Sequence, residues 1–308
     1  MPLAPEYQAM LDQLADTPGP AISEMTPTEA RELYRMMRPA NPELAVGGVS
    51  DRAIPGVDGE IPLRIYTPEA TGPHPVLVNF HGGGWVIGDL DTADGVCRDF
   101  CNTAECVVVS VDYRLAPEHV FPAAVDDAYT ATCWVADNQA ELNGNGKIAV
   151  CGESAGGNLA AVVCLKARDE VGPHIDFQLL LYPVVDCDMT RQSYVDNGTG
   201  YMLETDTMHW FWDHYCADLE QRKDPAASPL LAEDHGNLPP ALVVTAQFDP
   251  LRDEGGIYAE TLRAAGGNAE VVCYDGLLHD FFATAGIFQA SRPGFEHACS
   301  VLRDALAD

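Results

Sequence analysis

Apolar positions along the chain follow two patterns, one before and one after about residue 48. Residues 5–16 and 27–38 repeat apolar positions with a helical period, which predicts two amphipathic helices. The second is opened by Thr26-Pro27 and ends before Pro39, and Pro39 and Pro42 mark a linker. Beyond them, short runs rich in β-branched residues alternate with helical segments. The runs expected to be strands lie near residues 49–54, 61–67, 76–80, 107–111, 147–151, 177–182, 241–246 and 270–274.

Several of these runs are apolar from end to end, such as VLVNF at 76–80 and ALVVTA at 241–246. Strands without polar alternation are typical of a parallel sheet that helices cover on both faces. The covering helices are expected near residues 93–104, 122–140, 155–168, 253–265 and 294–306. The pattern therefore predicts the α/β class, with a mostly parallel eight-stranded sheet and helices on both faces.

One connection, between the strands at 177–182 and 241–246, is too long for a simple crossover. It is rich in aromatic residues, and we expect it to form a helical cap together with the N-terminal helices. The predicted domains are a core made of residues 46–183 and 227–308 and a cap made of residues 1–45 and 184–226.

Within this connection, Met208, Phe211, Trp212 and Tyr215 recur at helical spacing. Such a stripe usually packs a helix onto a core, and we favour this interpretation for most of its members. One or two of the four are expected instead to line a pocket under the cap.

The charge balance excludes two classes of partner. Lysine and arginine number 17 against 47 acidic residues, which gives a formal net charge of −30 over 308 residues. A surface this acidic repels nucleic acid and anionic lipid, so we expect neither nucleic acid nor a membrane as a partner.

The spacing of the cysteines indicates whether the chain binds a metal, and the N-terminal sequence indicates its cellular location. The tightest group, Cys97, Cys101 and Cys106, does not have the spacing of a zinc site. The start MPLAPEYQAM lacks the basic and apolar regions of a secretory signal, and no apolar stretch reaches membrane-spanning length. We expect reduced, mostly buried thiols, no metal and a cytoplasmic location.

Two glycine-rich turns follow predicted strands. In CGESAGGN at 151–158, a serine at position 154 lies between two glycines with the spacing of a nucleophile elbow, a sharp strand-to-helix turn. In FHGGGW at 80–85, the bare backbone of Gly83 and Gly84 lets their amides approach a developing oxyanion, with the amide of Ala155 as a third donor. A phosphate-binding loop would need GxxxxGK[ST] or GxGxxG, and neither is present.

A serine hydroxyl becomes a good nucleophile when a neutral imidazole takes its proton and a carboxylate orients that imidazole. Asp249 and His279 each follow a predicted strand, and the carboxyl ends of parallel strands meet at one edge of the sheet. We therefore predict Ser154, Asp249 and His279 as a catalytic triad. Asp253 and Asp280 are alternative candidates for the acid of the triad. They are less suitable, because Asp253 is expected to cap the next helix and Asp280, adjacent to His279, is expected to point away from it.

From about residue 50 onward, the chain resembles the hormone-sensitive-lipase family (family IV) of bacterial esterases. Six motifs carry this resemblance, and they occur in the same order as in the family. They are FHGGGW, DYRLAPEH at 112–119, GESAGG at 152–157, LYP at 181–183, DPLRDEG at 249–255 and LLHDF at 277–281. The resemblance implies an α/β-hydrolase fold with a helical cap and the same triad and oxyanion hole. It also implies hydrolysis of short- to medium-chain acyl esters without metal or cofactor, and homodimers through the last strand and helix.

Some positions in these motifs need separate interpretation. Glu153 stands where the family commonly has aspartate or threonine, which leaves the packing near the elbow open. Arg114 and Glu118 are expected to hold their loop through an ion pair rather than to touch substrate. The expected pocket lining is Trp85, Leu203, Phe211 and Trp212.

Two other functions use the same residues. An amide or formamide hydrolase would have the same machinery, because pocket shape sets the leaving-group preference. A ligand-binding protein on the same scaffold is the second alternative. Such relatives typically lose the triad histidine, whereas His279 is present. The expected partner is therefore a small-molecule ester.

Overall fold

The computed structural model describes residues 1–16 and 19–307, so residues 17, 18 and 308 of the predicted domains lie outside the described residues. A single sheet has the strand order β1-β2-β4-β3-β5-β6-β7-β8. β2 is antiparallel to β1 and β4, and all other neighbours are parallel, so the predicted sheet is confirmed. The strands are β1 (Gly48–Gly56), β2 (Gly59–Thr67), β3 (His74–Phe80), β4 (Val107–Val111), β5 (Gly144–Glu153), β6 (Phe177–Leu181), β7 (Ala241–Phe248) and β8 (Ala269–Leu278).

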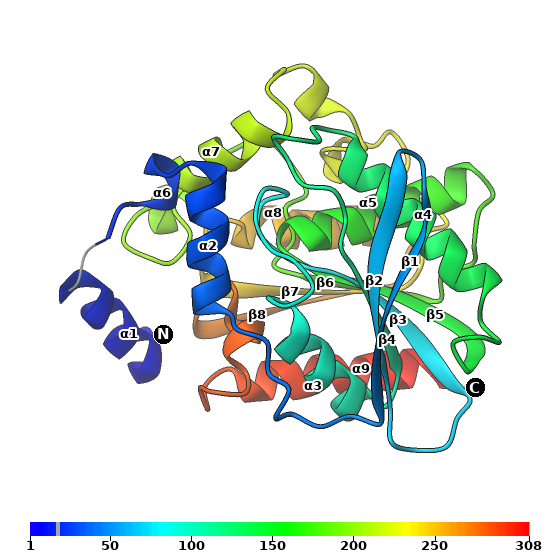
Figure 1. Ribbon diagram of the computed structural model, residues 1–308. Helices are drawn as coiled ribbons and strands as arrows, with labels where there is room; N and C mark the ends of the chain where they lie inside the picture. The colour runs from blue at the N-terminus through cyan, green and yellow to red at the C-terminus, as the bar shows by residue number, and fades with distance from the viewer. Residues whose placement is uncertain (17–18, 308) are drawn as a thin grey trace.

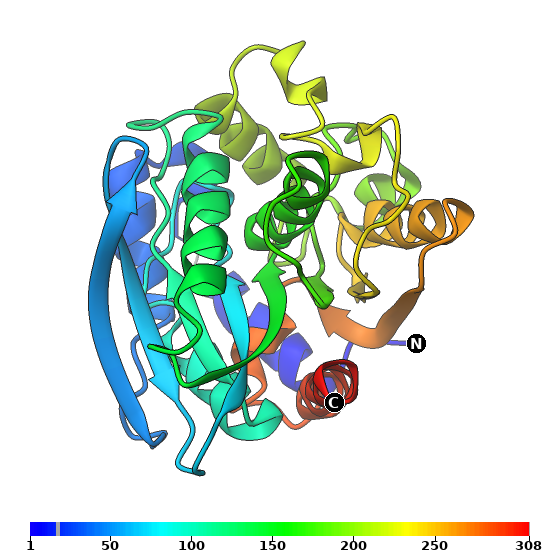
Figure 2. The same cartoon turned by 90° about the vertical axis from the view of Figure 1, so that its right-hand side faces the viewer.

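Helices cover both faces of this sheet (Figures 1 and 2). α4 (Ala123–Asp137), α5 (Ala155–Asp169) and α8 (Arg252–Ala264) lie on one face, and α3 (Asp94–Ala104) and α9 (Arg292–Leu306) lie on the other. Each face has its own cluster of buried apolar side chains, because the residues of a strand point alternately to the two faces. The continuous apolar runs of the central strands follow from this double cover.

The remaining helices lie towards the left of Figure 1, with α7 high in this view and α1 low. They are α1 (Pro5–Asp16), α2 (Pro27–Met37), α6 (Gln192–Asn197) and α7 (Thr205–Tyr215). At the start of α2, the Thr26 hydroxyl accepts from the Glu29 amide and the Glu29 carboxylate accepts from the Thr26 amide, so two free donors of the first turn are satisfied. α6 was not predicted, since six residues are too few to show a helical period.

The segment between β6 and β7 is fixed to the core at both of its ends by one side chain. Asn158 is buried on α5, and its Nδ2 donates to the carbonyl oxygens of Val184 at 3.0 Å and of Ala227 at 2.8 Å. The amides of Val184 and Asn158 both donate to the carbonyl of Ser154. The helix that follows Ser154 therefore holds the beginning and the end of the inserted segment together.

The sequence predicted that most cysteine side chains are buried. Seven of the ten cysteines are buried, which agrees with the expected burial of the thiols. Burial raises the pKa of Cys106 and of Cys151 well above the ordinary thiol value, so these side chains stay protonated.

Within residues 1–16 and 19–307, no helix combines the length and the apolar character that a membrane crossing requires.

Asn158→Ala is expected to lower the free energy of unfolding by about 2 to 4 kcal/mol, because it leaves two buried carbonyl groups without a donor. Urea titration measures the loss, and limited proteolysis should show earlier cleavage between residues 184 and 226. Asn138→Ala is the matched control, since Asn138 donates only to Trp134, one turn away in its own helix. Equal losses in the two variants would contradict the proposed double attachment.

Candidate active site

Ser154 lies on a strained turn between β5 and α5. Its φ of 56° and ψ of −115° place a residue with a side chain in a region that glycine normally occupies. A Cβ on Gly152 would lie 2.1 Å from the carbonyl oxygen of Gly156, and a Cβ on Gly156 would lie 1.9 Å from that of Phe80. Both glycines of the predicted elbow are therefore required by close backbone approach.

Asp249 and His279 come together at the ends of β7 and β8. The Nδ1 of His279 lies 2.8 Å from Oδ2 of Asp249, and the other Asp249 oxygen accepts from the Leu251 amide at 2.8 Å. Asp249 is fully buried, so its carboxylate has a fixed orientation. Burial alone would lower the pKa of His279, but the charge and hydrogen bond of Asp249, with smaller contributions from Asp280 and Glu153, outweigh it and raise the pKa.

The loop after β3 exposes backbone donors. Gly83 has a φ of 115° and Gly84 a φ of 56°, and a Cβ on Gly84 would lie 2.1 Å from the ring of Phe211. The amides of Gly83, Gly84 and Ala155 donate no hydrogen bond to any residue that the structure describes. Buried amides are normally paired, so donors left free beside a serine are suited to binding an anion.

These groups open onto one cavity of about 300 Å³, whose lining includes Ser154, His279, Gly83 and Gly84. The rest of its wall is mainly apolar and comes from three parts of the chain, represented by Tyr34, Leu203, Phe211 and Ile287. A larger groove of about 650 Å³ lies elsewhere, between α4, α5 and residues 224–234, and none of the predicted site residues lines it.

Two of the four residues expected in the pocket lie behind its wall. Leu203 and Phe211 line the cavity, whereas Trp85 and Trp212 do not. Trp85 is fully buried, stacks on Tyr215 with ring centroids 4.2 Å apart, and lies 4.9 Å from Trp212. The expectation for the two tryptophans was wrong because their rings pack α7 onto the glycine-rich loop. Within the stripe of α7, Phe211 is the member that faces the cavity.

The two competing carboxylates have other partners. Asp253 lies in the first turn of α8, but its Oδ2 accepts from the amide of Ser193 at 2.8 Å, so it attaches α6 instead of capping its own helix. Asp280 accepts from Arg38 at 2.5 Å, so its partner differs from that of Asp249, which pairs with His279. No sequence pattern indicated Arg38 as a site residue, since it only ends a predicted amphipathic helix.

Arg114 and Glu118 are both held by ion pairs, but with different partners. Arg114 donates to Asp127 on α4 at 2.8 Å and 2.9 Å. Glu118 accepts from Arg31 on α2 at 2.8 Å and 2.6 Å, and Arg31 also donates to the carbonyl of Val86 at 2.8 Å. The second pair therefore attaches α2 to the loop that contains the free amides.

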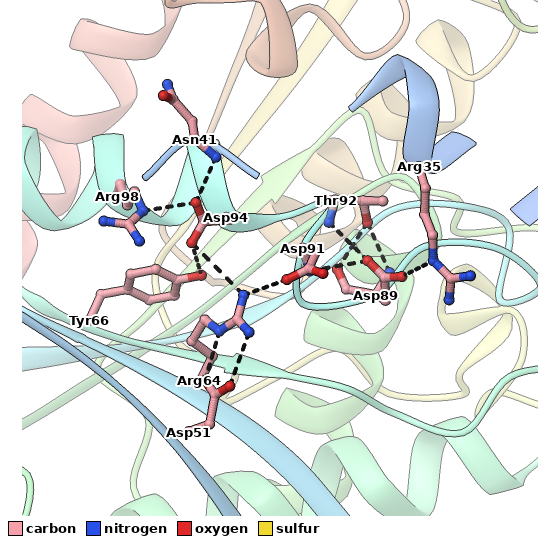
Figure 3. A network of polar contacts seen from close by, with 10 residues as sticks. All are labelled: Arg35, Asn41, Asp51, Arg64, Tyr66, Asp89, Asp91, Thr92, Asp94 and Arg98. Atoms are coloured by element: carbon pink, nitrogen blue, oxygen red, sulfur yellow. Dashed lines mark hydrogen bonds and ion pairs between the residues drawn. The ribbon is translucent and has the colours of Figure 1, made fainter. Parts of the chain in front are cut away.

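A polar network continues this attachment (Figure 3). Arg35 on α2 donates to Asp89 at 2.5 Å, and the amide of Asn41 donates to Asp94 at 2.8 Å. Arg64 on β2 pairs with Asp91 of the same loop at 2.7 Å. The acidic residues after the glycine-rich loop thus bind α2 and the linker that follows it. In the described part of the chain, no cluster of three histidine, cysteine, aspartate or glutamate side chains could hold a metal ion.

Known proteins resemble this chain in sequence and in fold. Residues 77–283 match the model of a family described as having the alpha/beta hydrolase fold. The chain is 46% identical to carboxylic ester hydrolase LipN of Mycobacterium tuberculosis, over 84% of this chain and 71% of that protein. It is 38% identical to carboxylesterase NlhH of the same species, over 98% of this chain and 97% of that protein.

Among solved structures, a hyperthermophilic esterase from the archaeon Pyrobaculum calidifontis superposes with a TM-score of 0.93 at 42% identity, covering 99% of both chains. A thermostable esterase from Pseudomonas putida gives a TM-score of 0.95 at 39% identity, covering 100% of this chain and 98% of that one. With a family match over more than half of its length and relatives of this similarity, the chain belongs to the alpha/beta hydrolase family.

Proposed function

We propose that this chain, a carboxylic ester hydrolase, cleaves short- to medium-chain acyl esters through an acyl-enzyme on Ser154, and that it belongs to the hormone-sensitive-lipase-like branch of its family. The strongest support is one arrangement: the pair of His279 with Asp249 at 2.8 Å lies at the same cavity as Ser154. The names of its relatives, carboxylic ester hydrolase and carboxylesterase, support ester substrates.

In the proposed reaction, Oγ of Ser154 attacks the ester carbonyl carbon while Nε2 of His279 takes the hydroxyl proton. Asp249 holds the imidazole through Nδ1 and stabilises the imidazolium that forms. The oxyanion accepts hydrogen bonds from the amides of Gly83, Gly84 and Ala155, each worth about 3 kcal/mol of barrier. The intermediate collapses, the carbon–oxygen bond to the alcohol breaks, and His279 gives its proton to the departing alcohol.

The second half of the reaction repeats these roles with water. A water molecule attacks the acyl carbon, and its proton passes to His279. The new tetrahedral intermediate expels Oγ of Ser154, which recovers the proton, and the carboxylic acid leaves. All the charges that develop are met by groups already in place, so the site needs little rearrangement between the two halves.

We also propose that residues 1–45 and 184–226 form a cap over the core of residues 46–183 and 227–308. Both parts of this cap contribute to the cavity wall, with Tyr34 from the first and Phe211 from the second. A cavity of about 300 Å³ is at the small end for ligand sites, which favours short acyl chains.

Ser154→Ala is expected to lower kcat for p-nitrophenyl butyrate by about 10⁴-fold or more, because no other group can form the acyl-enzyme. Stopped-flow release of nitrophenol measures this rate, and circular dichroism checks that the fold is kept. Ser50→Ala, on the exposed face of β1, is the control and should keep the full rate. A Ser154→Ala enzyme with nearly wild-type turnover would sink the proposal.

The pH profile follows from the raised pKa of His279. His279 accepts a proton only when it is neutral, so kcat/KM should fall as the pH drops through this pKa, with a midpoint above the ordinary value of 6.5. Asp249→Asn removes the raising charge and should move the midpoint to lower pH while reducing kcat by about 10⁴-fold. A wild-type midpoint below 6.5 would be inconsistent with the Asp249–His279 geometry.

Phe211→Ala is expected to shift the acyl preference towards longer chains, because its ring closes the cavity above Gly84. The ratio of kcat/KM for octanoate and acetate esters should rise by about 10-fold. Tyr201→Ala, in the same inserted segment but packed on Phe248 outside the cavity, is the control. An unchanged ratio in Phe211→Ala would show that the Phe211 ring does not limit the length of the acyl chain.

A further inference from the structure

One arginine from α2 reaches the residues next to both Ser154 and His279. Arg38 follows α2, and its side chain is only 9% exposed. Its Nη2 lies 3.1 Å from Oε2 of Glu153 and 2.5 Å from Oδ1 of Asp280. Glu153 directly precedes Ser154, and Asp280 directly follows His279. One guanidinium therefore bridges two chain segments that are 127 residues apart, since 280 − 153 = 127.

Hydrogen bonds and aromatic rings surround the Arg38 guanidinium and its carboxylate partners. Its Nη1 donates to the hydroxyl of Tyr34 at 2.7 Å, and its guanidinium carbon lies 5.1 Å from the centre of the Tyr34 ring. The Tyr182 hydroxyl donates to Glu153 at 3.0 Å, and the Tyr182 ring meets the ring of His279 edge-on at 4.8 Å. An uncompensated charge in such a place would be costly, so the cation and the carboxylates depend on one another.

The charges in this cluster do not balance, since one cation faces two carboxyl groups. Burial works to raise the pKa of Glu153, but the Arg38 charge and the hydrogen bonds from Asp280, Arg38 and Tyr182 outweigh it, so the pKa is lowered. Burial raises the pKa of Asp280 above its ordinary value, and the Glu153 carboxylate opposes the lowering effect of Arg38. Glu153 is therefore the more acidic of the two carboxyl groups, and Asp280 takes up a proton more readily.

We propose that Arg38 is a positioning residue that holds the neighbours of Ser154 and His279 together and offsets the negative charge beside the imidazole. This inference rests on the proposed roles of Ser154 and His279. It gives the N-terminal segment a part in the reaction, because without Arg38 the carboxyl groups of Glu153 and Asp280, next to Ser154 and His279 in the chain, would lose their cation.

Other charged and titratable groups surround His279 and the Arg38 cluster. They come from five places: Asp249 after β7 and Asp280 after β8, Glu153 and Tyr182 beside the elbow, Tyr34 on α2, and His81 after β3. Burial lowers the pKa of His81, so this second imidazole stays neutral and adds no charge. Loss of Arg38 thus changes the balance in one direction, towards more negative charge at His279.

Loss of the Arg38 charge raises the pKa of His279. A more negative surrounding favours imidazolium, so the pKa of His279 rises and a smaller fraction is neutral at a given pH. Glu153 and Asp280 take up some protons when Arg38 is lost, which reduces the change without reversing it. Removal of the Asp280 charge has the opposite effect, because Arg38 and Glu153 then balance each other.

The test compares pH profiles of kcat/KM, followed by pH-stat titration of the released acid. In Arg38→Met, the midpoint of the acidic limb should move up by about half a pH unit or more. Arg38→Lys keeps the charge and should keep the wild-type midpoint, even if its kcat falls. Asp280→Asn should move the midpoint down, and the double variant Arg38→Met with Asp280→Asn should return it towards the wild-type value.

Arg35→Met is the matched control. Arg35 lies on α2 and also pairs with a carboxylate, that of Asp89, but its side chain is 57% exposed. The substitution removes the same charge from the chain as Arg38→Met does. This variant should leave the midpoint unchanged. If Arg38→Met is too unstable to assay, the downward shift in Asp280→Asn still tests the charge balance.

Two results would overturn the inference. One is an unchanged midpoint in both Arg38→Met and Asp280→Asn, which would reduce Arg38 to a structural attachment of α2. The other is an equal shift in Arg35→Met, which would assign the effect to net charge alone. Neither result touches the nucleophile, whose failure would instead be seen as retained turnover in Ser154→Ala.

Discussion

The backbone turn at Ser154 is the constraint on which the site depends. A side-chain residue held at a φ of 56° costs roughly 1 to 3 kcal/mol, and it persists only where the surroundings fix it. Here β5 is paired on both sides and α5 is buried along almost its whole length. The missing side chain at Gly156 lets this helix approach the carbonyl of Phe80, which brings the elbow beside the loop of Gly83 and Gly84. Burial of the core thus stabilises a turn that is unfavourable by itself.

Three of the few cations of this acidic chain join the N-terminal segment to the core. Of 17 basic residues, three lie on or next to α2. Arg31 pairs with Glu118, Arg35 with Asp89, and Arg38 with Glu153 and Asp280. Exposed pairs such as that of Arg35 contribute little, because water screens them, whereas a buried charge depends strongly on its partners. The three contacts therefore differ in importance, and the one nearest the imidazole is the least exposed to solvent.

Local sequence patterns predicted the strands, the long helices and the two glycine-rich turns, because buried strands need continuous apolar runs and tight turns need glycine. Apart from Asp249 and His279, which were expected to meet because both follow parallel strands, they did not predict which side chains would meet across the fold. Arg38 contacts Asp280 at a separation of 242 residues, and no periodicity encodes such a pair. The contact between Trp85 and Trp212 was not predicted either. Their aromatic character suggested that they line the pocket, but they pack on each other behind the cavity wall. The antiparallel start of the sheet, β1 with β2, also depends on tertiary pairing and not on composition.

The cavity wall and the oxyanion donors belong to one packed unit, and this limits how the site can change. Phe211 of α7 covers Gly84 so closely that a Cβ there has no room, while Trp85, the next residue, stacks on Tyr215 of the same helix. A shift of α7 that made room for a larger acyl group would also disturb the backbone that presents the amides. Room for substrate and stabilisation of the oxyanion are thus coupled through the same contacts. A single side chain such as Phe211 can be shortened without moving α7, so pocket size is more easily altered by substitution than by movement of the helix.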